Sequence, residues 1–325
     1  MIALASCGDS ESLPTPEPAD SPPLQERPAG KVSSLSDEPE GLVADAVTGL
    51  VAVALRDPDR LVLLNAGSGR ITTRVDLPES ARHLQLAAPG GPVLAPLERA
   101  GLLARISLPD GDLKTVAVGK FPHDATGVGG GRVVVGNEFG DTLSFLDGAR
   151  TLATVPAPEQ PGGLAAAGDM VAVVAVTERV LEVFDTRTFR SLGSADAGVG
   201  PTHIVAARPS EVYVADTQGD AILRFRLGPE PKLAQTIELE GTPYGIALDA
   251  PRQRLWVTQT ALNRAVSLDL SADPPRVESS YPTVRQPNTI TVDQRSGRVF
   301  VASRTESELQ WFDPESSDDL GPPPR

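Results

Sequence analysis

The residues of this chain best suited to chemistry are its three histidines, because all of them fall within one recurring four-residue step. His83, His123 and His203 are each the second or third residue of a step that usually begins with proline, and Asp124 follows His123 directly. Imidazole nitrogens and carboxylate oxygens are the ligands that Zn²⁺ and similar ions take in proteins. The pattern therefore predicts a metal or anion site, with His83, His123 and His203 as metal ligands, if the fold brings the steps together.

The four-residue step is a repeat that extends through most of the chain. Its plainest copy is Pro243-Tyr244-Gly245-Ile246, and copies begin at residues 39, 81, 122, 161, 201, 243 and 287, which are 39 to 44 residues apart. A period of roughly 40 to 45 residues is typical of a four-stranded propeller blade. Seven copies predict an all-β fold, a seven-bladed β-propeller of four-stranded blades.

Each unit contains a pattern of four short strands separated by turns. The second strand is the most apolar, as in residues 50–55, 170–176 and 212–215. This is expected because neighbouring blades cover a second strand on both faces. Aromatic residues make up only 4% of the chain, which contains 30 glycines and 31 prolines. We therefore expect a core of Val, Leu, Ile and Ala, with Gly and Pro in the turns.

The two ends of the repeat region each supply part of one blade. Residues 31–36 have the pattern of an outer strand without its blade, whereas the last repeat has inner, second and third strands but no fourth. We expect the N-terminal strand to pair with the C-terminal blade, because this closure removes an exposed sheet edge. The propeller is predicted to span residues 31–316, followed by a disordered tail at 317–325.

One family pattern matches these repeats. Residues 243–247 (PYGIA) followed by 255–258 (LWVT), and residues 136–141 (GNEFGD) and 215–220 (ADTQGD), fit it well. The unit resembles the YVTN repeat of YncE-like seven-bladed propellers over about residues 31–316. It departs most in the second repeat, where Ala81 replaces proline and Pro96 follows the second strand. The resemblance implies the fold and leaves the function open, since propellers include binding modules, scaffolds, lyases and lactonases.

Cys7 is the only cysteine, so an internal disulfide is excluded. Residues 4–8 (LASCG) resemble the lipobox of bacterial lipoproteins, which implies lipidation of Cys7. Six residues before Cys7 are too few for a signal peptide, so this interpretation expects a start further upstream. The alternative is a chance match in a disordered tail.

The lipoprotein interpretation predicts a simple layout for the N-terminal region. Residues 1–7 are the remnant of a lipoprotein signal, and residues 8–30 are a disordered, acidic, proline-rich linker. The protein would then be extracytoplasmic and lipid-anchored to the bacterial cell membrane. No stretch of the sequence approaches the roughly 18 apolar residues that a membrane span needs.

The repeated step also predicts where a ligand could bind. Glycine at positions 41, 163 and 245 suits a crowded axis where seven inner strands converge, so larger residues at the step are the informative exceptions. We expect them to surround one mouth of the central channel. The predicted ligand-binding residues are Glu40, Arg82, His83, His123, Asp124, His203, Tyr244, Asn288 and Arg304.

The loops between second and third strands should open on the same face, because two antiparallel strands separate them from the step. These loops add polar residues to the candidate surface: Arg56, Asp57, Glu98, Arg99, Asn137, Glu138, Asp216, Gln218, Gln259, Asn263, Arg304 and Glu306. Mixed charge around a concave mouth suits a small polar ligand or a protein segment. Solvated loops with no binding role have the same composition.

Three interpretations of this face remain open. In the first, it is the binding surface of a non-catalytic binding or scaffold protein that takes a protein or a small polar ligand. In the second, a divalent metal at His83, His123 and His203 supports a metal-assisted lyase or hydrolase, although the repeated Gly-Pro-Asp-Gly-x-Leu-Trp-Phe pattern of the streptogramin lyases is missing. In the third, it is a water-filled mouth whose polar side chains bond to one another.

The charge of the chain bears on its partners. The formal net charge is −14, and five acidic residues and one basic residue precede Lys31, so the remainder still carries −10. Binding to phosphate groups needs a basic surface, so nucleic acid, including single-stranded DNA, is disfavoured. We expect a monomer that meets a membrane only through a lipid anchor.

Overall fold

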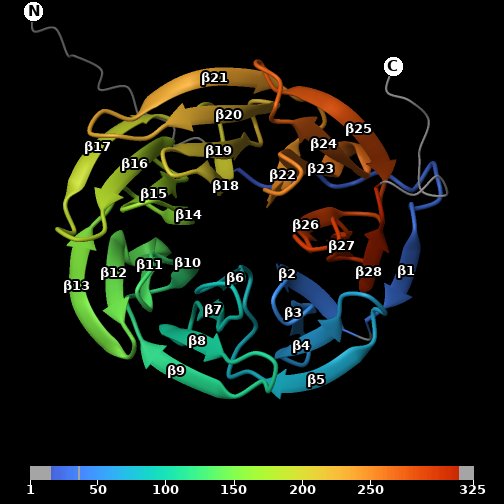
Figure 1. Ribbon diagram of the computed structural model, residues 1–325, viewed down its shortest axis with the longest axis horizontal. Helices are drawn as coiled ribbons and strands as arrows, with labels where there is room; N and C mark the ends of the chain where they lie inside the picture. The colour runs from blue at the N-terminus through green and yellow to red at the C-terminus, as the bar shows by residue number, and fades with distance from the viewer. Residues whose placement is uncertain (1–15, 36, 315–325) are drawn as a thin grey trace, which may run out of the picture.

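The computed structural model describes residues 16–35 and 37–314, and it shows seven four-stranded antiparallel sheets arranged in a ring (Figure 1). The helices within these residues are two 3-10 turns, η1 (Glu138–Gly140) and η2 (Thr260–Leu262). Neither approaches the length or apolar character of a membrane-crossing helix, and the described part of the chain has no other candidate. The predicted all-β, seven-bladed propeller is confirmed.

Strands in each blade run in chain order from the axis outward, except in the last blade (Figure 1). Blade one is β2 (Glu38–Asp45), β3 (Leu50–Arg56), β4 (Arg60–Asn65) and β5 (Ile71–Asp76). Blade two is β6 (Gln85–Leu86), β7 (Val93–Leu97), β8 (Leu102–Ile106) and β9 (Leu113–Ala117). Blade three is β10 (Pro122–Gly127), β11 (Arg132–Asn137), β12 (Thr142–Asp147) and β13 (Arg150–Pro156). Blade four is β14 (Pro161–Ala167), β15 (Met170–Ala175), β16 (Val180–Asp185) and β17 (Ser191–Asp196).

The remaining three blades complete the ring. Blade five is β18 (Pro201–Arg208), β19 (Glu211–Asp216), β20 (Ala221–Arg226) and β21 (Lys232–Glu238). Blade six is β22 (Pro243–Asp249), β23 (Arg254–Gln259), β24 (Arg264–Asp269) and β25 (Arg276–Pro282). Blade seven is β26 (Pro287–Val292), β27 (Val299–Ser303), β28 (Glu308–Phe312) and β1 (Lys31–Ser34).

Blade seven is built from both ends of the propeller sequence. Its strand order is β26, β27, β28 and then β1, with Lys31 opposite Trp311 and Ser34 opposite Glu308. The predicted closure is therefore confirmed, and β1 covers the edge that β28 would otherwise expose.

Blade two departs from the common scheme at its inner strand. β6 contains only two residues, and Ala81 to Leu84 form no ladder with β7. In the register of this pair, where Gln85 is opposite Leu94, the residue facing His83 would be Pro96. Proline has no N–H to donate to a ladder, which accounts for the early end of pairing in the most degenerate repeat.

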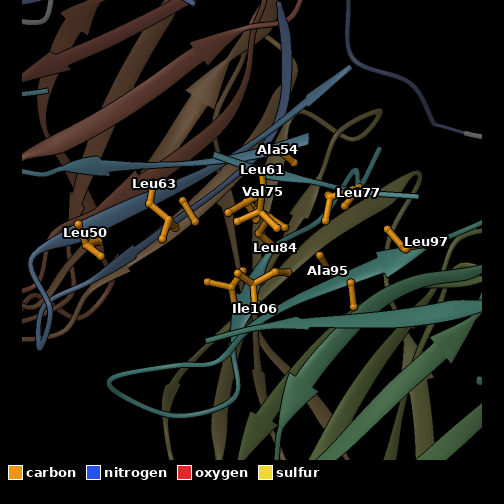
Figure 2. Close-up of a cluster of buried hydrophobic side chains, with 14 residues drawn as sticks. Leu50, Ala54, Leu61, Leu63, Val75, Leu77, Leu84, Ala95, Leu97 and Ile106 are labelled. Atoms are coloured by element: carbon orange, nitrogen blue, oxygen red, sulfur yellow. The ribbon is translucent and has the colours of Figure 1, made fainter. Parts of the chain in front are cut away.

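The core lies between neighbouring blades. Alternate residues of β3 face opposite neighbours: Leu50 and Ala52 pack against blade two, and Val51 against Phe300 of blade seven. Figure 2 shows the side chains of blades one and two meeting in this way. Both faces of the second strand are thus buried, as expected. Trp256 is also buried, beside the rings of Tyr281 and Phe312.

Residues 16–30 lie against blades six and seven, and Figure 1 shows the dark blue stretch that precedes β1 beside these blades. The Ser21 N–H donates to Gln286 Oε1 over 2.8 Å, Asn263 Nδ2 donates to the Pro22 carbonyl over 2.8 Å, and Arg264 pairs with Glu26 at 2.7 Å. The expectation of a disordered linker therefore does not hold for residues 16–30. Polar side chains of the propeller satisfy the backbone groups that an extended, proline-rich segment cannot satisfy itself. Cys7, residues 8–15 and the tail at 317–325 lie outside the described residues.

Candidate functional site

The repeated step positions two rings of residues around the channel axis. Its second residues are Glu40, Arg82, His123, Gly162, Thr202, Tyr244 and Asn288, and its third residues are Gly41, His83, Asp124, Gly163, His203, Gly245 and Thr289. The axis is crowded as expected: a Cβ added to Gly41 would lie 3.0 Å from the Arg82 carbonyl oxygen, and one on Gly245 would lie 2.9 Å from that of Asn288.

Two adjoining cavities lie at this end of the channel. The larger, about 390 Å³, runs along the inner strands, and the smaller, about 60 Å³, adjoins it and is also lined by Pro16 and Glu17. Arg82, His83, His203 and Tyr244 line both cavities and so separate them. Every residue predicted for the channel mouth lines one cavity or both: Glu40, Arg82, His83, His123, Asp124, His203, Tyr244, Asn288 and Arg304.

The three histidines form a continuous row of rings. The ring centroid of His83 lies 4.5 Å from that of His123 and 5.0 Å from that of His203, and His203 lies 4.5 Å from the ring of Tyr244. Nδ1 of His203 is buried and has no hydrogen-bond partner among the described residues. The fold thus brings together imidazoles from blades two, three and five.

Two carboxylates converge on one nitrogen of His123. Nδ1 of His123 lies 2.7 Å from Glu98 Oε1 and 3.3 Å from Glu138 Oε2, and the three side chains are 9%, 13% and 11% exposed, respectively. Glu98 follows β7, His123 lies in β10, and Glu138 begins η1 directly after β11. One ligand atom from each residue lies within 4.8 Å of the others, so the three side chains form a candidate metal site.

This candidate site shares only one residue with the ligand set predicted from the sequence. His123 belongs to it, whereas His83 and His203 contact neighbouring rings and do not belong to the group. Glu98 and Glu138 were recognised as part of the candidate surface, but nothing in their spacing identified them as partners of His123. The only signal was their position after the second strands of blades two and three.

Burial and charge act differently on the two carboxylates. Burial favours the neutral form of both. For Glu98, the hydrogen bond from His123 and the charges of His123 and Arg82 outweigh burial and lower the pKa. For Glu138, burial raises the pKa, the charges of Glu98 and Glu17 raise it further, and those of His123 and Arg82 only partly oppose them. The negative charge of Glu138 is thus less well compensated by nearby positive charge than that of Glu98.

The other rings of the row remain uncharged. Burial lowers the pKa of His83 well below its usual value, with further lowering by the charges of His123 and His203. Burial also lowers the pKa of His203 to about 3, with smaller effects of His123 and Arg82. Burial raises the pKa of Tyr244 to about 12. The row therefore presents neutral imidazoles and a neutral phenol to a ligand.

Three guanidinium groups surround Glu40 at the rim. Arg56 and Arg304 each lie 3.2 Å from Glu40 Oε1, and Arg82 lies 4.0 Å from Oε2. Glu40 is only 4% exposed, whereas Arg56 and Arg82 are 34% exposed and Arg304 is 41% exposed. The arginines thus hold the buried carboxylate and still present N–H groups to the mouth.

Asp124 has a structural role that the sequence did not suggest. Its carboxylate accepts hydrogen bonds from the backbone N–H groups of Ala125 and Leu164, both at 2.8 Å, and from Gln85 Nε2 at 3.0 Å. Burial outweighs these bonds and raises the pKa of Asp124 to about 6. These hydrogen bonds link blades two, three and four. The carboxylate oxygens of Asp124 are therefore already bonded within the protein. Asn288 is similarly engaged, since its Oδ1 accepts a 3.0 Å hydrogen bond from Gln286.

Comparison with known proteins identifies the fold and goes no further. No family model and no curated protein matches the sequence. Solved structures do align over nearly the whole chain. Virginiamycin B lyase from Staphylococcus aureus has a TM-score of 0.71 at 16% identity, covering 86% of this chain and 97% of that one. A chain of the mitotic checkpoint complex has a TM-score of 0.75 at 13% identity, covering 95% and 99%, respectively.

A third similar structure is that of a different protein. A chain of hydrazine synthase from Kuenenia stuttgartiensis has a TM-score of 0.71 at 11% identity, covering 87% of this chain and 97% of that one. The three structures thus share the propeller and differ in function, as expected for a fold that hosts many kinds of site. The function has to be argued from the channel mouth.

Proposed function

We propose that this protein is a binding protein whose ligand site is the channel mouth, and that a divalent cation held by Glu98, His123 and Glu138 forms part of this site. The observation that carries the proposal is the convergence of both carboxylates on Nδ1 of the buried His123. One imidazole and two carboxylates suit Zn²⁺ or Mn²⁺. The cation would also neutralise the poorly compensated charge of Glu138.

The adjoining cavity supports a small polar molecule as the ligand. Its volume of about 390 Å³ is in the range of cavities that take small molecules, roughly 300 to 1,000 Å³. Arg82 and Arg304 supply donors at its rim, and the unpaired Nδ1 of His203 lies at its boundary with the smaller cavity. A buried polar atom without a partner is uncommon in proteins, which favours a bound ligand or solvent here.

The protonation state of the histidines favours binding over catalysis. A general base works best when its pKa is near the working pH. The pKa of His203 is about 3, and that of His83 is also far below its usual value, so both imidazoles are weak bases. They are better suited to hydrogen bonding and stacking with a ligand than to removing a proton.

Metal titration tests the proposal. After dialysis against EDTA, calorimetry with Mn²⁺ or Zn²⁺ should show one site per chain. Glu98→Gln and His123→Ala should each weaken binding at least about tenfold, since even the loss of an outer-shell group has that effect. Glu230→Gln, which removes a charge from a side chain that is 83% exposed, is the matched control. Absence of binding by the wild type, or wild-type affinity in folded His123→Ala, would refute the cation site.

A metal-assisted lyase or hydrolase is the second candidate, favoured by one observation. The ring of His83 lies 4.5 Å from that of His123, so a neutral imidazole adjoins the proposed cation site. Virginiamycin B lyase shares the fold. Incubation of the metal-loaded protein with virginiamycin B, followed by chromatography and mass spectrometry, tests that substrate. Turnover that is lost in His123→Ala would support the enzyme, and an unchanged antibiotic would exclude this reaction.

The sequence alone supports a further proposal about location. Cys7, which lies outside the described residues, would carry a lipid and hold the propeller at the extracytoplasmic face of the membrane. In a bacterial host that expresses the natural gene with its upstream region, metabolic labelling with palmitate should mark the wild type but not Cys7→Ala. Equal labelling of both would contradict the lipid anchor.

A further inference from the structure

The rim of the larger cavity has more positive groups than negative ones. Glu40 forms ion pairs with three guanidinium groups, those of Arg56 and Arg304 at 3.2 Å and that of Arg82 at 4.0 Å. Among the described residues, the only other carboxylate that pairs with any of the three is Glu98, 3.9 Å from Arg82. Three arginines thus share two carboxylates. In a chain with a formal net charge of −14, this rim is a local excess of positive charge.

The N–H groups of two of these arginines are available to a ligand. Arg82 and Arg304 both line the larger cavity, and their side chains are 34% and 41% exposed. Each approaches Glu40 through Nε, but neither is aligned for a hydrogen bond to any described residue. A guanidinium group has five N–H donors, arranged in a planar fork that matches the oxygens of a carboxylate or a phosphate group.

The acidic groups of the larger cavity are already engaged by the protein. Among the described residues that line it, only Glu40 and Asp124 are acidic. Glu40 is held by the arginines, and Asp124 accepts hydrogen bonds from the backbone N–H groups of Ala125 and Leu164. The charged groups that remain open to a ligand are therefore the arginine donors, which complement an anion.

The cavity also has room for the rest of such a ligand. Its volume is about 390 Å³, and the rings of His83, His203 and Tyr244 line it beside Arg82. The ring of His203 lies 5.0 Å from that of His83 and 4.5 Å from that of Tyr244, so the rings form a continuous wall. Aromatic rings pack favourably against planar apolar groups. The cavity therefore suits a molecule with one acidic group and a planar body.

We propose that the ligand of the larger cavity is a small organic anion, whose carboxylate or phosphate group binds Arg82 and Arg304. Its body would lie beside the rings of His203 and Tyr244. This inference rests on the proposed function for the place of the ligand, but it does not require the cation. Because both arginines are partly exposed, salt screens their attraction for an anion, and the affinity should fall as the ionic strength rises.

Calorimetry with probes of similar shape tests the charge of the ligand. Benzoate and phenyl phosphate are the anionic probes, and benzamide is the neutral one. In EDTA, the wild type should bind at least one anion, and benzamide at least about tenfold more weakly, since hydrogen bonds to charged groups are the stronger ones. The better anion identifies the acidic group. Binding of neither anion, or equal binding of benzamide, would overturn the proposal, whereas metal titration decides separately on the cation site.

Arg304 is the residue to replace, because its ion pair is with Glu40 and it is remote from the contacts of His123. Arg304→Gln should weaken binding of the better anion at least about tenfold. Arg304→Lys keeps the charge but loses the fork, so its affinity should be intermediate. Arg187→Gln is the matched control, because it removes the same charge from a side chain that is 68% exposed and lines neither cavity. Wild-type affinity in Arg304→Gln, or an equal loss in Arg187→Gln, would refute the anion site.

Discussion

Glu98 and His123 belong to different blades, yet Glu98 Oε1 lies 2.7 Å from Nδ1 of His123. The contact spans the boundary between blades two and three, and Glu138 reaches the same nitrogen from the far end of β11. One of these two carboxylates is stabilised in its charged form and the other is not. This asymmetry leads to opposite expectations for two otherwise identical substitutions.

We predict that Glu138→Gln stabilises the metal-free protein, whereas Glu98→Gln destabilises it. Burial and like charges raise the pKa of Glu138, so its charge opposes folding at neutral pH. Glu98 has a lowered pKa, and its replacement removes a charge-assisted hydrogen bond that contributes about 1.5 to 3 kcal/mol. Urea unfolding at pH 7 in EDTA should give midpoints on opposite sides of the wild type. Midpoints shifted in the same direction would contradict this account.

A second prediction concerns acid stability and Asp45. Its carboxylate accepts hydrogen bonds from the Thr48 hydroxyl at 2.6 Å and from the Gly90 N–H at 2.8 Å, which link blades one and two. Burial alone would raise the pKa of Asp45, but these bonds together lower it below 3.8. A lowered pKa means that Asp45 stabilises the fold above pH 3.8 and that this contribution is lost as the pH falls through the folded-state pKa.

Asp45→Ala should therefore cost stability at pH 7, by about 1.5 to 3 kcal/mol for the loss of hydrogen bonds to a charged group. The difference from the wild type should shrink as the pH falls below 3.8. Unfolding curves at a series of pH values would measure it. A difference that stays constant down to pH 2 would exclude ionised Asp45 as its source.

The blades were predictable because every blade needs the same strands in the same order. The apolar second strands and the proline that starts most inner strands therefore recur at a regular spacing. Blade seven was also predictable, because the N-terminal end has an outer strand without a blade and the last repeat lacks its outer strand. The crowded axis was predictable from Gly41, Gly163 and Gly245 for the same reason. Blade two has the shortest inner strand, next to Pro96, which cannot donate to a ladder.

The contacts within the site were not predictable in the same way. The repeat identified the face on which His123 lies, but its partners come from loops whose sequences do not repeat. Residues 16–30 were misjudged because proline and acidic residues are typical of linkers. The contacts of Ser21 with Thr260 and Gln286 span 239 and 265 residues, respectively, so no local pattern could reveal them.

Closure of the ring gives a third prediction. Removal of residues 1–34 deletes β1 and exposes the edge of β28, whereas removal of residues 1–22 leaves β1 in place. We expect the longer truncation to lower the thermal midpoint far more and to cause aggregation, because an open edge can pair with another molecule. Differential scanning fluorimetry with light scattering would measure both. Equal midpoints for the two truncations would refute closure as a source of stability.

A final prediction tests the crowding at the channel axis. Gly245→Ala would place a Cβ 2.9 Å from the Asn288 carbonyl oxygen and 3.0 Å from Thr258 Oγ1, so blades six and seven would have to move apart. We expect a loss of about 1 to 3 kcal/mol, the usual cost of overpacking. Gly228→Ala is the matched control, because a Cβ there meets no atom within 4 Å. Urea unfolding of both variants would give the comparison, and a loss for Gly245→Ala no larger than that for Gly228→Ala would mean that the inner strands adjust freely and that crowding does not select glycine there.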